Sequence, residues 1–433
     1  MAESASALRS GARAASVEHH LRPGALQLAA LPPLALYVHL PWCLAKCPYC
    51  DFNSHAIDAP MAPVAPSPRG GASGLGRPGA GPPSALPEAR YLQALRADLE
   101  AALPLVWGRP IVSVFIGGGT PSLFSPDGID ALLSSARALL PLEPACEVTL
   151  EANPGTFERE RFRAFAQAGV NRLSIGVQSF DDTLLQRIGR VHDAAQARAA
   201  AQEAHETFER FNLDLMYALP GQSLEQLQRD LDTALAFEPP HLSVYHLTIE
   251  PNTRFALHPP PRPDDDLASD MLDAIVERTA RAGLARYEVS AFARPGRECV
   301  HNMNYWQFGD YLGIGAGAHS KLSFPHRVVR QQRWREPASY MAQALQGDAV
   351  SNEHEVARDA LAFEFMLNAL RLRNGFATRL FGERTGMPLS SIEAALQQAE
   401  RRGLIDRDAS QVRPSAHGFD FLSDLQQLFL PPS

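Results

Sequence analysis

Short apolar runs alternate with amphipathic stretches from residue 34 to about residue 247 of the chain. The apolar runs predict strands at residues 34–40, 111–116, 147–150, 172–177, 212–216 and 241–247. The stretches between them predict helices at residues 88–103, 127–140, 158–168, 181–188, 194–208 and 224–237. Strands that alternate with helices in this way are typical of βαβ units around a parallel sheet. The pattern therefore predicts an α/β fold with six such units.

The remaining third of the chain follows a different pattern. Residues 286–291 predict one more strand, and residues 299–320 read as a long loop region that is rich in motifs. From about residue 356 the pattern is helical, and we interpret residues 355–433 as a small, α-rich, winged-helix-like domain. Such domains often bind DNA, but a fold alone does not give a function. No Arg/Lys-rich recognition face is evident, so DNA binding is disfavoured.

Two segments lack the composition of a packed domain. Residues 58–87 consist mainly of Pro, Gly, Ala and Ser, which predicts a flexible insertion. Residues 1–30 are rich in Ala, Ser and Arg and have no compact apolar run of the kind found in secretory signals. We predict a disordered leader there, although Arg9 and Arg13 leave a targeting segment open. We predict that residues 31–330 form one domain, made of the six β/α units and a C-terminal extension of them.

The overall composition excludes some function classes. The chain has 433 residues and a formal net charge of −8, which gives no basic footprint for nucleic acid and counts against RNA modification. No apolar run approaches the ~18 residues of a membrane span. Three of the five cysteines are clustered, which fits a metal site in a reducing compartment such as the cytoplasm. Cys146 and Cys299 are interpreted as buried free thiols.

Candidate chemistry begins in the loop after the first strand. Cys43, Cys47 and Cys50 have the spacing C-x3-C-x2-C, so their thiolates can face one soft metal centre. Three cysteines suit an iron–sulfur cluster that leaves one iron open to a ligand. A zinc site completed by His55 is a second interpretation, and three buried structural cysteines are a third.

Further polar residues and glycines lie where strands end. The run Gly117-Gly118-Gly119-Thr120 follows the second strand, and glycine there allows a ligand to approach the backbone. Glu151 and Gln178 end the third and fourth strands, and Asp214 lies just before the end of the fifth. Each of them alone could form an ordinary structural hydrogen bond. Because functional groups of parallel barrels project from these ends, we expect a shared ligand site.

The cysteine loop resembles that of radical SAM enzymes, and more of the chain resembles the oxygen-independent coproporphyrinogen oxidase group. The matching segments are residues 36–43, 117–121, 176–180 and 214–217. This resemblance implies a partial (β/α)6, TIM-like barrel with a [4Fe–4S] cluster on the three cysteines. It also implies contacts to S-adenosylmethionine from Tyr37, Tyr49, Gly118, Gly119, Thr120 and Glu151. Positions at the adenosyl or second-ligand site would be Gln178, Arg190 and Asp214.

Two features favour the heme chaperone branch of that group, HemW. The oxidases carry a fourth cysteine two residues after the third, where this chain has Phe52. Residues 301–306 match the H-N-x-x-Y-W signature of the heme chaperones. That resemblance implies binding of heme and its transfer to acceptor proteins such as respiratory enzymes. The alternative is a coproporphyrinogen III dehydrogenase that decarboxylates two propionates through a 5′-deoxyadenosyl radical.

His301 is the candidate residue for heme. A histidine beside aromatic side chains can ligate heme iron while the rings cover the macrocycle. It can equally cap or hydrogen-bond a loop. The glycine-rich residues 313–318 are followed by a second candidate, His319, and not by the helix that a dinucleotide-binding fingerprint requires.

Overall fold

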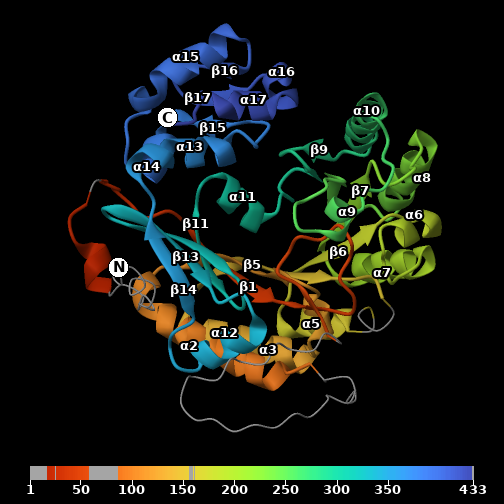
Figure 1. Ribbon diagram of the computed structural model, residues 1–433, viewed down its shortest axis with the longest axis horizontal. Coiled ribbons are helices and arrows are strands. Elements are labelled where there is room, and N and C mark those ends of the chain that lie inside the picture. The colour runs from red at the N-terminus through yellow and green to blue at the C-terminus, as the bar shows by residue number, and fades with distance from the viewer. Residues whose placement is uncertain (1–16, 25, 58–85, 156–158, 160, 432–433) are drawn as a thin grey trace, which may run out of the picture.

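The structure is a computed structural model that describes residues 17–24, 26–57, 86–155, 159 and 161–431. Its main element is one sheet of twelve strands (Figure 1). Seven neighbouring strands of this sheet run parallel: β11 (Asp310–Ile314), β1 (Leu34–Leu40), β4 (Ile111–Gly118), β5 (Leu142–Ala152), β6 (Arg172–Gln178), β7 (Arg210–Tyr217) and β8 (His241–His246).

Antiparallel strands extend both edges of the sheet. On the β11 side they are β12 (His319–Phe324), β13 (Arg327–Arg333) and β14 (Val350–Glu355), and on the β8 side β10 (Ala291–Ala293) and β9 (Ala285–Arg286). The sheet therefore ends at β14 and β9 and does not close on itself. The six predicted β/α units are confirmed, with strands β1, β4, β5, β6, β7 and β8 in chain order.

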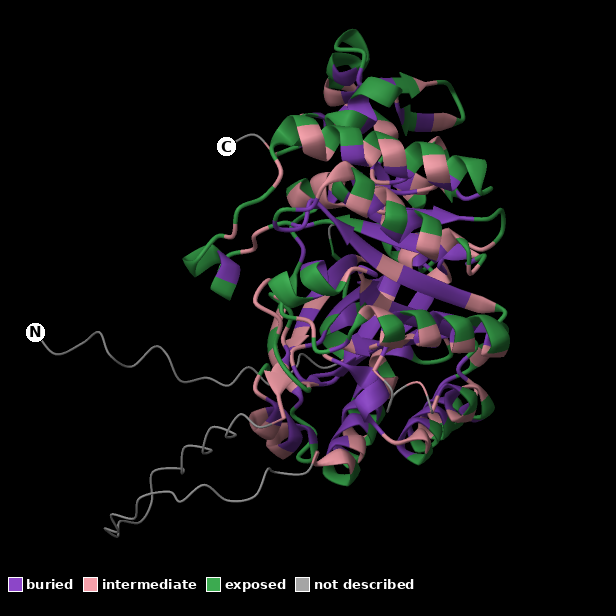
Figure 2. Cartoon of the chain, turned by 90° about the vertical axis from the view of Figure 1, so that its right-hand side faces the viewer, coloured by how far each residue is buried: buried purple, intermediate pink, exposed green. Residues whose placement is uncertain are grey.

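Helices cover the outer face of the sheet (Figure 1). They are α2 (Glu88–Val106), α3 (Pro126–Leu139), α5 (Phe162–Ala168), α6 (Asp182–Arg187), α7 (Ala194–Thr207), α8 (Leu224–Leu235), α10 (Asp265–Arg281) and α12 (Pro337–Ala344). The short helix α9 (Arg254–Leu257) lies against the cysteine loop instead, where the Phe255 amide donates to the Pro48 carbonyl. Helix α7 turns four fully buried alanines to the core, which lets it lie close to the strands. Figure 2 shows the resulting pattern, with buried residues along the strands and exposed residues on the outer faces of the helices.

The prediction of a loop region at residues 299–320 is wrong. The segment forms helix α11 (Val300–Trp306), strand β11 and the start of β12. Glycine has a low propensity for strands, so residues 313–317 do not look like a strand in the sequence. Residues 310–314 nevertheless form a strand, because they pair in parallel with β1. Gly313 is needed there, since a Cβ atom would meet the carbonyl oxygen of His319 at 2.0 Å. Gly313, which suggested a loop in the sequence, therefore allows β11 and β12 to lie close together.

A small domain follows the sheet, as predicted. It comprises α13 (Arg358–Ala369), β15 (Phe376–Ala377), α14 (Thr378–Thr385), the short 3-10 helix Leu389–Ile392, α15 (Glu393–Arg401), β16 (Ile405–Arg407), β17 (Gln411–Pro414), α16 (Ala416–Asp420) and α17 (Leu422–Gln427). Its three strands form a sheet of the order β15-β17-β16, and Phe365, Phe376 and Phe381 meet edge to face in its core.

The described part of the predicted leader is ordered, contrary to the expectation of disorder. It contains helix α1 (Val17–Leu21), and the amides of Leu26 and Leu28 donate to the carbonyl oxygens of His326 and Pro325. Leu26 is 3% exposed because it packs into the core of the C-terminal domain. Residues 1–16 and the predicted insertion, apart from its last two residues, lie outside the described residues.

Two shorter elements complete the architecture. Strands β2 (Trp42–Cys43) and β3 (His55–Ala56) pair in parallel within the cysteine loop, and the 3-10 helix Pro121–Leu123 follows β4. Among the described residues, no helix combines the length and apolar character needed to cross a membrane.

Candidate functional site

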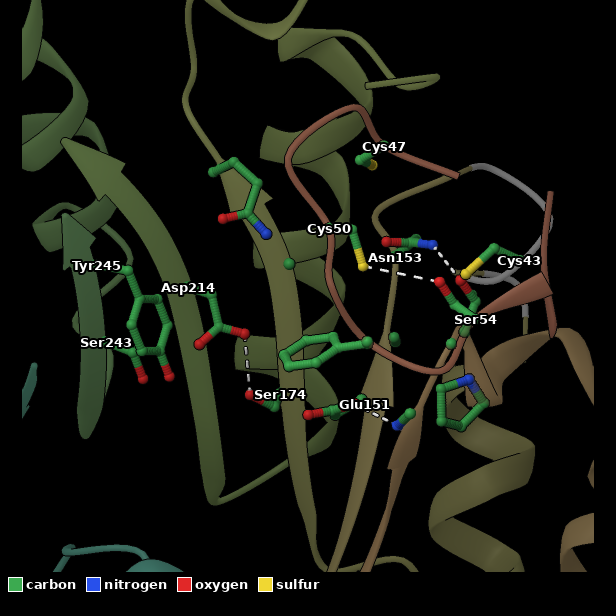
Figure 3. A pocket seen from close by; sticks show the side chains of 18 of the residues that line it. Cys43, Cys47, Cys50, Ser54, Glu151, Asn153, Ser174, Asp214, Ser243 and Tyr245 are labelled. Carbon is green, nitrogen blue, oxygen red and sulfur yellow. Dashed lines mark hydrogen bonds between the residues drawn. The ribbon is translucent and has the colours of Figure 1, made fainter. Parts of the chain in front are cut away.

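A cavity of about 420 Å³ lies at the carboxyl ends of the parallel strands. Figure 3 shows its walls: strands β5 to β8 on one side and the cysteine loop across the other. It collects most of the residues that the sequence singled out. Cys43, Cys47, Tyr49, Cys50, Gly118, Gly119, Thr120, Glu151, Gln178, Arg190 and Asp214 all line it.

The cysteine loop is held against the end of β4 by the glycine run. The amide of Gly119 donates to the Leu40 carbonyl at 2.8 Å, and that of Thr120 donates to the Trp42 carbonyl at 2.7 Å. A Cβ atom on Gly119 would lie 2.5 Å from the Trp42 carbonyl oxygen, so a larger residue would push the loop away. The glycines thus position the loop as well as leaving backbone open to a ligand.

All three thiols of the loop are free and partly exposed to the cavity. Burial raises the pKa of the Cys43 thiol, a hydrogen bond with Thr120 lowers it, and the neighbouring Cys50 and Cys47 raise it further. Within the described residues, no three His, Cys, Asp or Glu side chains converge on a single metal ion. His55, the fourth ligand of the zinc interpretation, is not among the described residues that line this cavity. Separate thiols around one cavity suit a cluster in which each iron takes its own thiolate.

Asn53 anchors the far end of the loop. Its Nδ2 atom donates to the carbonyl oxygens of Ala316 at 2.9 Å and of Arg335 at 2.8 Å. A Cβ atom on Gly317 would meet that Nδ2 atom at 2.5 Å, so the glycine-rich residues 313–317 support the cysteine loop. His39 completes the anchor, because its Nε2 atom lies 3.0 Å from the carbonyl oxygen of Asn53.

Arg190 joins the loop to the strand wall. Its guanidinium donates to the Asn153 Oδ1 at 2.6 Å, to the Gly176 carbonyl at 2.7 Å and to the Cys47 Sγ at 3.6 Å. Burial opposes its charge, but the neighbouring Tyr49 and Cys47 raise the pKa of Arg190 overall. A fixed cation therefore lies beside one of the three thiols.

Two carboxyl groups occupy the wall opposite the loop. Glu151 accepts a hydrogen bond from the Gly118 amide at 3.1 Å, and Asp214 accepts from Ser174 at 3.2 Å and from Asn212 at 2.8 Å. Burial, and then the charge of Asp214, raise the pKa of Glu151 to about 8. Burial also raises the pKa of Asp214. At neutral pH Glu151 is therefore mainly protonated, and the pair can both donate and accept hydrogen bonds.

Sequence reasoning missed several polar residues of the wall, although a signal for them existed. On β6 the positions that line the cavity alternate, and β7 and β8 repeat this pattern. Polar residues at every second position of otherwise apolar strands mark a solvated inner face. The missed residues on these strands are Arg172, Ser174, Asn212, Ser243 and Tyr245, and Asn153, which follows β5, was missed as well.

Tyr37 and His301 lie together, next to the cavity. Neither belongs to the described residues that line it, whereas Phe115 and Asn302 beside them do. The Tyr37 hydroxyl hydrogen-bonds to the Nδ1 of His39 at 2.9 Å, and its ring centroid lies 6.3 Å from that of His301. The His301 ring lies 4.8 Å from the ring of Phe115. Tyr37 is thus placed as a link between the loop anchor and helix α11.

Helix α11, which carries His301, is fixed by a buried carboxylate. The Oε1 of Glu147 on β5 accepts hydrogen bonds from the amides of Val300 at 2.8 Å and of His301 at 3.4 Å. The His301 Nδ1 atom lies 3.3 Å from the hydroxyl of Ser113 on β4. Burial lowers the pKa of His301 to about 4, so its imidazole is neutral at physiological pH.

Comparisons with known proteins agree with this geometry. The radical SAM superfamily matches residues 37–234, and the HemN C-terminal domain matches residues 356–421. Heme chaperone HemW of Haemophilus influenzae is 42% identical over 406 residues, which are 92% of this chain and 98% of the relative. Heme chaperone HemW of Escherichia coli K12 is 43% identical over 405 residues, which are 93% of this chain and 100% of the relative.

The chain belongs to the heme chaperone HemW family of radical SAM proteins. The resemblance seen in the sequence is thereby confirmed, including the branch indicated by residues 301–306. A heme chaperone HemW from Bacillus subtilis is 32% identical over 386 residues, which are 87% of this HemW-family chain and 93% of that relative.

A solved structure confirms the fold of this HemW-family chain. Coproporphyrinogen III oxidase (HemN) from Escherichia coli superposes with a TM-score of 0.74 over 92% of this chain and 90% of the oxidase. The two sequences are only 22% identical, so the likeness shows a shared radical SAM fold.

Proposed function

We propose that the protein is a heme chaperone that binds heme and transfers it to acceptor proteins. The observation that carries the proposal is the position of α11, which brings Asn302 of the H-N-x-x-Y-W signature into the wall of the cysteine-lined cavity and His301 beside it. Relatives named heme chaperone HemW align over nearly the whole chain, which supports it. Phe52, at the position of the oxidases' fourth cysteine, supports it further.

In this proposal Cys43, Cys47 and Cys50 hold a [4Fe–4S] cluster. S-adenosylmethionine would fill the cavity beside it, against Gly118, Gly119, Thr120, Glu151 and Tyr49, with Gln178, Arg190 and Asp214 at its adenosyl end. When bound, the cluster and S-adenosylmethionine supply one-electron chemistry. The chain's own residues provide open backbone at Gly118 and Gly119 and the hydrogen-bonding carboxyl pair.

Heme would bind beside α11, with His301 as iron ligand or as a hydrogen-bonding support. Its neutral imidazole is the form that can ligate iron. The rings of Phe115 and Tyr37 lie next to the His301 imidazole and would offer apolar faces to a macrocycle. Tyr37 would then serve heme as much as S-adenosylmethionine.

We propose respiratory enzymes as heme acceptors and the cytoplasm as the location. The five free cysteines of the described chain suit a reducing compartment. The net charge of −8 argues against nucleic acid as a partner.

A paired assay on one anaerobically reconstituted preparation tests the proposal. Heme is titrated in while the Soret band is followed, and coproporphyrinogen is supplied with a reductant and S-adenosylmethionine. Uptake of about one heme per chain without turnover of coproporphyrinogen supports the chaperone. Absence of heme uptake would refute it. Catalytic formation of protoporphyrinogen would favour the alternative, coproporphyrinogen III dehydrogenase.

A further inference from the structure

Three arginines gather where the C-terminal domain meets the edge of the barrel sheet. Arg286 lies on β9, and Arg371 and Arg373 lie in the turn between α13 and β15. Backbone contacts join these segments: Glu288 and Leu372 form a β-bridge, and the Arg373 amide donates to the Tyr287 carbonyl at 2.9 Å. The joint places like charges together, which costs free energy unless an anion is present.

Arg286 and Arg373 share one aromatic ring. The guanidinium carbon of each lies 4.9 Å from the centroid of the Phe419 ring on α16, and Phe419 itself is buried. Stacking on a ring fixes a guanidinium while its N–H edge stays open to a planar anion. Arg286 uses two of its nitrogens on the Val289 carbonyl, at 3.1 and 2.6 Å.

The positive charge of this cluster is only partly balanced. Arg371 pairs with Glu288 at 3.5 Å, while its Nε atom is buried and has no hydrogen-bond partner among the described residues. Within the part of the chain that the structure describes, Arg286 and Arg373 form no ion pair. Burial lowers the pKa of Arg286 and the charge of Arg373 lowers it further, while Tyr217, Glu288 and Asp420 raise it. An anion placed between them would relieve this repulsion.

The cluster adjoins the cavity through helix α11. Arg371 places its guanidinium carbon 4.3 Å from the centroid of the Trp306 ring, and the buried Trp306 Nε1 has no partner in the part of the chain that the structure describes. Trp306 lies one turn beyond Asn302, on the same side of the helix, and Asn302 lines the cavity. Figure 1 shows α11 between the barrel sheet and the C-terminal domain, with β9 beside it.

We infer that Arg286, Arg371 and Arg373 form the site that holds the two propionate groups of heme. This inference rests on the proposed function and assigns the anionic end of its ligand. Heme carries both carboxylates on one edge and is otherwise apolar. The arginine cluster, which Arg371 joins to the C-terminal end of α11, would face the carboxylates. The aromatic rings beside His301, near the N-terminal end of the helix, would face the apolar macrocycle. Carboxylates pair with guanidinium edges through two parallel hydrogen bonds, which gives the ligand a fixed orientation.

The test compares hemin with hemin dimethyl ester, in which both carboxylates are blocked, in one detergent-containing buffer. The variants are Arg373→Gln and Arg286→Gln, with Arg373→Lys to retain the charge. Arg402→Gln is the matched control, because Arg402 is exposed in the same domain and makes the same charge change. Thermal unfolding of each variant checks that the fold is kept.

Each glutamine variant is expected to bind hemin about tenfold more weakly, which corresponds to about 1.4 kcal/mol. Binding of the dimethyl ester should be unchanged by the same substitutions, and wild type should prefer hemin to the ester. Arg373→Lys should lose less affinity than Arg373→Gln, and Arg402→Gln should match wild type.

The outcomes separate this inference from the proposed function. If wild type takes up no hemin, both fail. If wild type binds hemin and ester equally, or the glutamine variants bind hemin as wild type does, the propionate site is refuted while the chaperone function stands. Equal loss of affinity for hemin and ester would assign these arginines a purely structural role and would also overturn the inference.

Discussion

The Nη1 atom of Arg190 lies 3.6 Å from the Sγ atom of Cys47. The same guanidinium is fixed by Asn153 and by the Gly176 carbonyl, so its charge cannot move away from the sulfur. This contact ties the loop that carries the thiols to the wall formed by the strands. It also gives the Cys47 thiolate a cationic neighbour.

Loss of that cation should make the proposed cluster harder to reduce. In Arg190→Gln, the positive charge that favours the more negative, reduced state is gone. About 1 kcal/mol of charge stabilisation corresponds to a shift of about 40 mV to more negative potential. A redox titration followed by electron paramagnetic resonance measures it. Arg163→Gln, on the exposed face of α5, is the control, and an unchanged potential in Arg190→Gln would contradict the prediction.

The three loop cysteines should each be indispensable for the cluster. Serine at position 43, 47 or 50 removes one thiolate, so reconstitution should give no stable brown chromophore and reduced iron and sulfide content. Cys146→Ser and Cys299→Ser are matched controls, because both residues are buried away from the cavity. Full iron and sulfide content in Cys47→Ser would refute the assignment.

His301→Ala should weaken heme binding or shift the Soret maximum while the iron–sulfur absorbance stays intact. A direct iron–imidazole bond predicts the shifted maximum, and a hydrogen-bonding role predicts only lower affinity, by about tenfold. His319→Ala is the comparison variant, because His319 is the second candidate ligand and is exposed. If the double variant binds heme with wild-type affinity and spectrum, the heme site lies elsewhere.

The pH dependence of heme binding should follow the lowered pKa of His301. A free imidazole becomes protonated below pH ~6.5 and can then no longer ligate iron. Burial lowers the pKa of His301 to about 4, so the neutral form persists through pH 5. Heme affinity measured between pH 7 and 5 should therefore change little in wild type. A tenfold loss of heme affinity between pH 7 and 5 in wild type, but not in His301→Ala, would contradict this prediction. It would show that the His301 imidazole takes up a proton well above pH 4.

The buried His39 should make folding sensitive to acid. Burial lowers its folded-state pKa to about 4, while the unfolded chain takes up the proton near ~6.5. The unfolded state therefore binds more protons between these values, and stability falls as the pH drops from 6.5 towards 4. For this one group the loss between pH 7 and 5 is about 2 kcal/mol.

Urea unfolding of the apoprotein measures this dependence. His39→Gln can still donate to the Asn53 carbonyl but does not titrate, so its stability should decline about 2 kcal/mol less over the same pH range. Identical pH profiles for the variant and wild type would exclude His39 as a source of the acid sensitivity.

The six β/α units could be predicted from sequence because each strand is a short apolar run flanked by amphipathic helices. The position of the cavity could also be predicted, because functional side chains of parallel strands gather at the carboxyl ends of the strands. Glu151, Gln178 and Asp214 all line it. The edge strands could not be predicted in the same way. β11 contains Gly313, and its place depends on pairing with β1, which is almost 280 residues earlier in the chain.

In the cavity wall, too, residues could be predicted where the pattern lies within one strand, but not where it depends on contacts between distant segments. Ser174 and Asn212 follow an alternation that is visible in the sequence, so they could have been found. The contact of Arg190 with Cys47 could not, because it depends on how the segment between α6 and α7 lies against the cysteine loop. Arg286, Arg373 and the Phe419 ring that they share likewise come from three separate segments and meet only in the folded chain.

The burial of Leu26 in the core of the C-terminal domain has a consequence for biosynthesis. A ribosome adds residues at about 5–20 per second, so the partners of Leu26 emerge on the order of tens of seconds after it. Phe365 and Phe381 belong to the same core, and a Cβ atom on Gly386 would lie 3.1 Å from the backbone of Gln27. During that interval residues 26–28 can bind only the carbonyl oxygens of Pro325 and His326, and Leu26 lacks most of the core that buries it. Residues 26 and 27 are therefore synthesised early, but their packing is completed only after residues 365–386 have been made.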